Sequence, residues 1–188
     1  MRARVIATAD TEQAAQALAQ EVQVSTDGGQ VRATGPERGD RRSGWHVSFE
    51  VWVPGKADVT VRTRNGGISI ADVSGTLLVE AVNGGVSLSR LSGDVRGTTV
   101  NGGISVELGR DRWQGAGLDA RTTNGGLRLK VPDGYSCQLG LSTVNGRMRA
   151  DFPMTVQGRL GHRLDLPLGR GGAPVRLTTT NGGVHVTR

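Results

Sequence analysis

The chain has 188 residues, which is enough for one domain or for one domain with a small flank. Only 3 % of the residues are aromatic, which argues against a core of bulky rings and against a stacking platform for single-stranded nucleic acid. The formal charge of +6 comes almost entirely from arginine, so it suits either a polyanionic partner or an ordinary solvated basic surface. No apolar run approaches the ~20 residues of a membrane-spanning helix.

Residues 1–57 are predicted to form an N-terminal flank that caps the rest of the chain and folds with it as one unit. The stretch DTEQAAQALAQEV predicts a short helix at about 11–21, because its apolar residues recur at helical spacing and Asp10 can cap it. Strands are expected at about 22–34 and 45–53. The second of these carries three aromatic residues, and we expect it to help the helix close one end of the repeat region.

Residues 58–188 are organised around a repeated Asn-Gly corner. Successive corners are 18, 18, 23, 21 and 36 residues apart, which is typical of a stacked repeat, and the last interval is long enough to hide a degenerate coil within 150–175. Apolar residues and threonine alternate with polar residues on both sides of each corner, so each unit reads as two short half-buried strands. The corner asparagines are Asn65, Asn83, Asn101, Asn124, Asn145 and Asn181.

The corner motif by itself fits both a hairpin and the bend of a solenoid, because Asn and Gly tolerate positive φ in either setting. Hairpins would place Arg121 opposite Arg128, whereas parallel coils would place Arg62 beside Glu80 and Arg96 beside Asp119. The charges therefore favour an all-β fold, a single-stranded parallel β-solenoid of about six to eight coils. The alternative is an antiparallel β-sandwich of Asn-Gly hairpins.

Two structural expectations follow from a parallel stack. The six corner asparagines should lie above one another and form a hydrogen-bonded ladder, as stacked amides do in cross-β structures. A stack also has exposed ends, so we expect residues 151–172 to fold back over one of them, and we expect end-to-end self-association wherever an edge stays open.

The residues that usually carry chemistry form no recognisable site. His46, His162 and His185 lack metal-ligand spacing to one another or to acidic residues, and the lone Cys137 reads as a small core residue. The outward row four residues after each corner begins with three serines, but no base accompanies them. We therefore expect no catalytic, cofactor-binding or metal-binding residues, and no cofactor.

Three segments resemble a bacterial family of domains of unknown function that is labelled as an adhesin by analogy. They are WHVSFEVWVPGKADVTVRTRNGGISI, SGTLLVEAVNGGVSL and the more specific tail DFPMTVQGRLGHRLDLPLGRGGAPVRLTTTNGGVHV. The resemblance implies a β-solenoid and an extracytoplasmic location in the periplasm or at the cell surface, with a leader or anchor preceding this sequence. The alternative is a cytoplasmic protein, since the first ten residues lack the apolar run of a signal peptide. Gly97, in place of an inward apolar residue, and Arg147, in place of the second corner glycine, depart from the repeat.

The resemblance also implies a non-enzymatic scaffold or adhesin-like binding module of the bacterial cell envelope. Its partner would be a carbohydrate, a lipid or a protein. The alternatives are a basic surface that binds acidic polysaccharide, lipid headgroups or, least expected, nucleic acid, and a β-helix enzyme that acts on polysaccharide.

Overall fold

The computed structural model describes residues 1–36, 43–151 and 161–188. The chain divides into two compact units, Met1–Trp52 and Val53–Arg188, so the division falls five residues before the predicted boundary at 57. Whether the first unit closes an end of the second, as the sequence suggests, stays a prediction.

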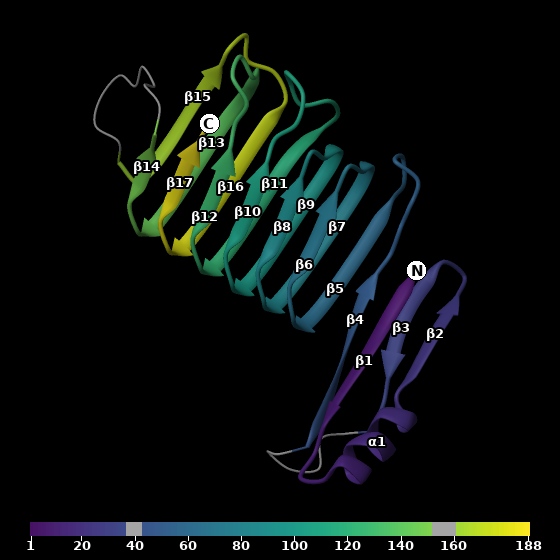
Figure 1. The fold of residues 1–188 in the computed structure, drawn as a ribbon. Coiled ribbons are helices and arrows are strands. Elements are labelled where there is room, and N and C mark those ends of the chain that lie inside the picture. The colour runs from purple at the N-terminus through teal and green to yellow at the C-terminus, as the bar shows by residue number, and fades with distance from the viewer. Residues whose placement is uncertain (37–42, 152–160) are drawn as a thin grey trace. The chain divides into compact units, whose positions relative to one another are not determined.

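The first unit contains two antiparallel strand pairs and a helix (Figure 1). Strand β1 (Arg2–Thr8) pairs with β4 (Gly44–Glu50), and β2 (Gln23–Asp27) pairs with β3 (Gln30–Thr34). Helix α1 (Glu12–Glu21) packs against β1. Its N-cap is Thr11 and not Asp10, because the Thr11 hydroxyl accepts a hydrogen bond of 3.2 Å from the Ala14 amide.

The second unit consists of two facing sheets, and the strands that form its coils run parallel within each sheet (Figure 1). Among the described residues the long sheet has seven strands, in the spatial order β15 (Arg163–Leu168), β13 (Cys137–Asn145), β16 (Pro174–Asn181), β11 (Gly117–Asn124), β9 (Ser92–Asn101), β7 (Ser74–Asn83) and β5 (Val59–Asn65). The short sheet has six described strands, in the order β14 (Met148–Ala150), β17 (Val184–Thr187), β12 (Leu127–Lys130), β10 (Ile104–Glu107), β8 (Val86–Ser89) and β6 (Ile68–Ala71).

This arrangement is a β-solenoid, as predicted, and the hairpin alternative is wrong. Each coil passes from a long-sheet strand through the Asn-Gly corner into a short-sheet strand, and six such coils are described. Arg62 lies in register with Glu80, and their side chains are 2.6 Å apart. Arg96 lies in register with Asp119, but each forms its ion pair within its own strand, Arg96 with Asp94 and Asp119 with Arg121.

The order of the coils differs from their order in the chain. The last coil, β16 and β17, lies between the fourth coil, β11 and β12, and the fifth coil, β13 and β14 (Figure 1). The expectation that successive coils are neighbours therefore fails at this point. The interval of 36 residues does not conceal a degenerate coil in its described part, since β15 runs antiparallel to β13.

Strand β15 covers the end of the long sheet. Leu164 of β15 is buried against the column of inward side chains, and Gln138 of β13 donates a 2.6 Å hydrogen bond to Asp165. This is the fold-back expected of residues 151–172, and it is observed for the part outside 152–160. An antiparallel strand ends the stack, because it pairs with the exposed edge without continuing the coil.

The core is a continuous column of aliphatic side chains between the two sheets. Its largest fully buried members are Leu77, Leu88, Ile104, Leu127, Leu129, Leu139, Leu177, Val79, Val95, Val175, Val184 and Val186. Leu88 fills the space beside Gly97, since a Cβ added at Gly97 would lie 3.1 Å from Cδ1 of Leu88. The insertion in the 23-residue interval adds the buried Trp113, whose indole N–H donates to the Gly93 carbonyl at 3.0 Å.

Candidate binding face

The six corner asparagines form one hydrogen-bonded row along the edge of the second unit. Five hydrogen bonds of 2.8–2.9 Å join them, each from the side-chain amide of one asparagine to the side-chain carbonyl of its neighbour. The spatial order is Asn65, Asn83, Asn101, Asn124, Asn181 and Asn145, so the inserted coil takes its place in the row. The row fixes the height of each coil and holds the adjoining strands in register.

At most corners the first residue after asparagine must be glycine because the backbone of the neighbouring coil lies very close to it. Its φ angle requires glycine at only one corner. A Cβ at Gly84, Gly102, Gly125, Gly146 or Gly182 would overlap the carbonyl oxygen of the corner glycine in the neighbouring coil. Among these first corner glycines only Gly66 has a positive φ, and none of the corner asparagines has one. The explanation of the motif by left-handed backbone geometry is therefore wrong at most corners.

Inward threonines close the corners from inside the stack. The buried hydroxyls of Thr99, Thr122, Thr143 and Thr179 each donate to the first corner glycine of the neighbouring coil, at 2.7–2.9 Å. A partly buried carbonyl without a donor would destabilise the corner, so these hydroxyls satisfy groups that aliphatic side chains cannot. The threonines at this position are thus structural residues.

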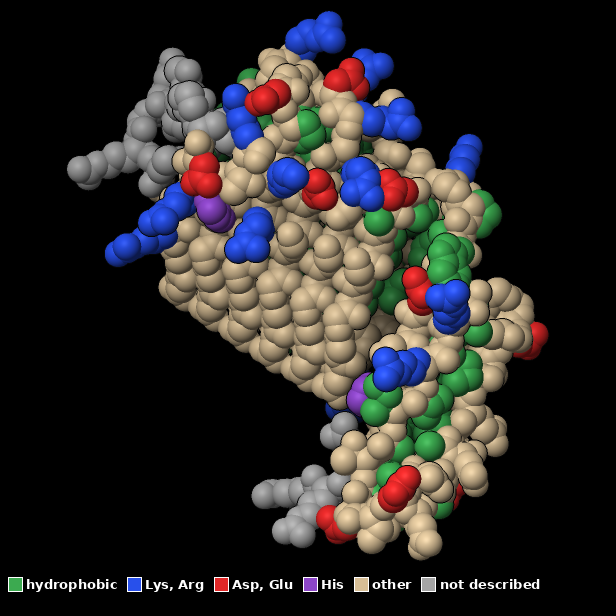
Figure 2. Space-filling model, in the orientation of Figure 1, with side chains coloured by type: hydrophobic (Ala, Val, Ile, Leu, Met, Phe, Trp, Pro, Cys, Tyr) green, Lys and Arg blue, Asp and Glu red, His purple; other side chains and the backbone are tan. Residues whose placement is uncertain are grey.

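The outer face of the short sheet, which we call the flat face, is made of small residues over the coils that come first in the chain. One row contains the second corner glycines, Gly67, Gly85, Gly103, Gly126 and Gly183, and ends at Arg147. The next row contains Ser69, Ser87, Ser105, Arg128, His185 and Arg149. Figure 2 shows most of this face as a broad area without hydrophobic or charged side chains, with charged side chains along its border. These two rows line a shallow open hollow.

One end of the flat face is basic. Arg128, His185 and Arg149 occupy three adjacent strands in register, and Arg147 lies in the corner just before the last of these strands. The His185 ring is 2.8 Å from the Asp151 carboxylate. In the described part of the chain the three arginines have no acidic partner, so their guanidinium groups face solvent. The sequence placed Arg128, Arg149 and His185 in one outward row, four residues after their corners, but it did not place His185 between the two arginines.

The family model of Toastrack DUF4097 matches residues 8–187. The chain belongs to the Toastrack DUF4097 family. The expected membership in a family of domains of unknown function with a β-solenoid-like fold is thereby confirmed, whereas the match assigns no ligand. No curated protein and no solved structure matched the chain.

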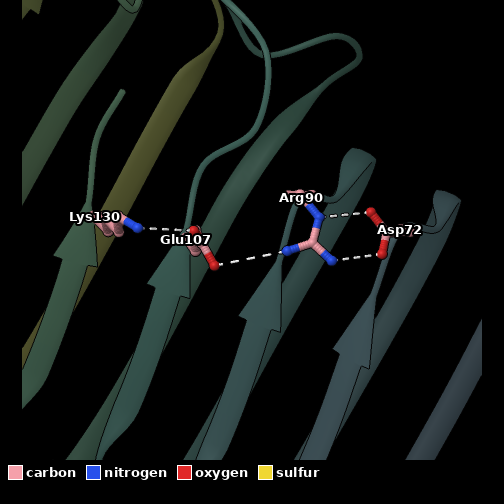
Figure 3. A network of polar contacts seen from close by, with 4 residues as sticks. All are labelled: Asp72, Arg90, Glu107 and Lys130. Carbon is pink, nitrogen blue, oxygen red and sulfur yellow. Dashed lines mark hydrogen bonds and ion pairs between the residues drawn. The ribbon is translucent and has the colours of Figure 1, made fainter. Parts of the chain in front are cut away.

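A second cluster of charges in the Toastrack domain braces four coils at the edge of the short sheet opposite the asparagines (Figure 3). Arg90 forms a bidentate pair with Asp72, at 2.6 and 2.7 Å, and lies 3.7 Å from Glu107, which also contacts Lys130 at 3.2 Å. The hydrogen bond from Arg90 lowers the pKa of the Asp72 carboxyl. Because every basic residue here has an acidic partner, the cluster is a structural brace.

The other histidines and the cysteine are not among the residues that form the flat face. His46 lies on β4 in the first unit, and His162 accepts a hydrogen bond from the Thr143 amide through its backbone carbonyl. Cys137 is fully buried, and burial raises its thiol pKa to about 11. Within the described ranges, no three His, Cys, Asp or Glu residues are grouped as metal ligands would be, and no helix has the length and apolarity needed to cross a membrane.

Proposed function

We propose that this Toastrack domain is a non-enzymatic binding module that holds an extended anionic polymer along its flat face. The observation that carries the proposal is the row of Arg128, His185 and Arg149, which continues directly from the serine row. The small residues let a chain-like ligand lie close to the sheet, and the arginines supply fixed charges at one end of its path. Guanidinium groups suit carboxylate and phosphate oxygens, with which they form two parallel hydrogen bonds.

The spacing of the charges favours a polymer over a single small anion. Adjacent parallel strands lie about 4.8 Å apart, so Arg128 and Arg149, two strands apart, are separated by about 10 Å at their backbones. Arg147 and Arg149 are two residues apart in extended chain at the start of β14, which corresponds to about 7 Å. Such separations allow each guanidinium to meet a different charged unit of a polyuronic acid or a polyphosphate. The net charge of +6 adds long-range attraction.

Among the described residues no base lies beside the serine row, and this supports binding over catalysis. Ser105 lies on β10 and His185 on β17, with β12 between them, so the imidazole cannot accept the serine proton directly. The imidazole instead contacts Asp151. We further propose that the polymer belongs to the bacterial cell envelope and that the domain acts there as an extracytoplasmic, adhesin-like scaffold, as the sequence resemblance implies.

The proposal is tested with polygalacturonate, polyphosphate and neutral dextran as ligands for the full chain. The unchanged protein should bind at least one of the two polyanions at low salt, should bind it less as salt rises, and should ignore dextran. The test variant is the double substitution Arg128→Ser and Arg149→Ser, because serine already occupies this row in three coils. We expect its affinity to fall about tenfold or more, since a hydrogen bond to a charged group contributes about 1.5–3 kcal/mol.

The matched control removes the same charge from the other sheet. Arg64 and Arg176 lie on the long sheet, so the double substitution Arg64→Ser and Arg176→Ser lowers the net charge equally and leaves the flat face unchanged. We expect this control to keep most of the affinity. Equal losses in the two double variants would mean that net charge alone attracts the polymer, and no binding of either polyanion at low salt would contradict the proposed function.

A further inference from the structure

We infer that Asn145 is a site of spontaneous deamidation in the folded protein and that the other five corner asparagines are protected from it. Asparagine followed by glycine is chemically labile, because the small glycine lets its backbone nitrogen attack the preceding side chain. In that step the Gly146 nitrogen forms a bond to Cγ of Asn145, and the Cγ–Nδ2 bond breaks with release of ammonia. Water then opens the cyclic imide to aspartate or isoaspartate.

Five of the six corners engage the attacking nitrogen in a hydrogen bond. The backbone N–H groups of Gly66, Gly84, Gly102, Gly125 and Gly182 each donate to the backbone carbonyl of the asparagine in the adjacent coil, at 2.9–3.1 Å. An engaged N–H cannot lose its proton or turn toward the side chain until the bond breaks. The same bond also fixes the backbone at the corner, so the geometry for ring closure is out of reach.

The corner at Asn145 lacks this protection because it is the last in the spatial order. Asn145 belongs to β13, beyond the inserted coil, and no further corner follows it in the described part of the chain. Within those residues the Gly146 N–H has no hydrogen-bond acceptor. The Asn145 side chain keeps one bond of the row, its donation to Asn181, and its own carbonyl receives none from another corner.

Asn65, at the other end of the row, is a natural control. Its side chain also has only one bond of the row, since it accepts from Asn83 and has no corner to donate to among the described residues. The Gly66 N–H, however, donates to the Asn83 carbonyl at 2.9 Å. At both ends the asparagine side chain has one hydrogen bond of the row instead of two. The ends differ in the glycine N–H, which is hydrogen-bonded at Gly66 and, in the described part of the chain, not at Gly146. Comparing the deamidation rates of Asn65 and Asn145 therefore shows whether the cause is the free Gly146 N–H or a general fraying at the ends of the stack.

The experiment is a time course of the folded full chain at mildly alkaline pH, followed by tryptic peptide mapping with mass spectrometry. Trypsin separates the corners into the peptides 65–90, 97–110, 122–128, 131–147 and 177–188, and fragmentation distinguishes the two corners in the first. We expect Asn145 to convert at least about tenfold faster than every other corner, because breaking one further hydrogen bond costs about that factor in rate. In denaturant, all six should convert at similar rates.

Two outcomes would overturn the inference. If Asn65 converts as fast as Asn145, the ends of the stack fray and the free nitrogen is not the cause. If Asn145 converts no faster than Asn101 in the folded chain while all sites convert in denaturant, the corner at Asn145 is protected by other means. Conversion also replaces an amide by a carboxylate two residues from Arg147, so ion-exchange chromatography supplies a second measure of the modified fraction.

Discussion

The Asn181 side chain donates a 2.8 Å hydrogen bond to Asn124, which precedes it by 57 residues, and accepts one from Asn145. The last coil of the chain is therefore an interior coil of the stack. Coils four and five each present a strand edge to it, so neither can complete its pairing on that side before the C-terminal segment arrives. The stability of the second unit therefore depends on its final residues more strongly than it would if the coils were stacked in chain order.

The inserted coil should behave energetically as core. Leu177 is fully buried, and we expect Leu177→Ala to lower the free energy of unfolding by about 2–5 kcal/mol. Ile70→Ala, in the first coil, should cost less, because Ile70 is only partly buried. Urea denaturation of both variants measures the difference. Equal losses, or a smaller loss for Leu177, would argue against an interior position of the last coil.

The two glycines of one corner should differ in how well they tolerate substitution by alanine. A Cβ at Gly125 would overlap the Gly102 carbonyl, whereas a Cβ at Gly126 would lie 3.5 Å from the Gly183 carbonyl, an ordinary contact. We expect Gly125→Ala to destabilise the fold by about 1–3 kcal/mol, the usual cost of forcing extra atoms into a packed site. Gly126→Ala should be close to neutral. Denaturant unfolding compares the two, and equal effects would show that close approach is not what selects the first glycine.

The ion pair of Asp72 and Arg90 should make the free energy of unfolding depend on pH in the acidic range. The Arg90 hydrogen bond lowers the folded-state pKa of Asp72 below its ordinary value of 3.8, so the folded protein releases this proton more readily than the unfolded chain. The contribution of this pair to the free energy of unfolding is therefore complete above the pKa of Asp72 in the unfolded chain. It is lost as the pH falls below about 4, through the pKa of Asp72 in the folded protein. Arg90→Asn removes the charge and suits the positive φ of 51° at this position.

We expect the difference in unfolding free energy between the native chain and Arg90→Asn to be constant from neutral pH to about pH 5 and to shrink below about pH 4. Unfolding in urea at a series of pH values measures it. High salt should also reduce the difference, because the groups are exposed. A difference that stays constant down to the lowest pH at which the protein folds would contradict the role given to this pair.

The Cys137 thiol should be inert in the folded protein. Burial raises its pKa to about 11, so little thiolate is present at neutral pH and reagent cannot reach it. We expect a thiol-specific reagent to label the native chain slowly and the unfolded chain at once. The labelled fraction against urea concentration should follow the unfolding transition measured by circular dichroism. Rapid labelling before that transition would place the thiol at an accessible surface.

Much of the coil structure could be predicted from the sequence because it is encoded locally. Alternation of inward and outward residues defined the strands on both sides of each corner, and the position relative to Asn65 or Asn83 fixed which residues share a row. The pairing of Arg62 with Glu80 followed from that register. The helix was likewise predictable from its apolar spacing, although its cap lies one residue later, at Thr11.

The basic end of the flat face could be predicted only in part. Arg128, Arg149 and His185 share an outward position relative to their corners, and this pattern is visible in the sequence. That His185 separates the two arginines depends on where the last coil is inserted. A row of outward residues read in chain order would place the arginines on adjacent coils, about 4.8 Å apart, and would misjudge the spacing of the ligand that they fit.

The sequence by itself determined the shape of each coil, since alternation and turn chemistry act between residues close together in the chain. Only the tertiary structure decided the order of the coils and the need for the corner glycines. Val175, Leu118 and Leu139 occupy equivalent inward positions with similar side chains, so no local preference distinguishes one neighbour from another. The order is set by which edges are left open and by the antiparallel strand β15 that closes the last one, and these are properties of the assembled stack.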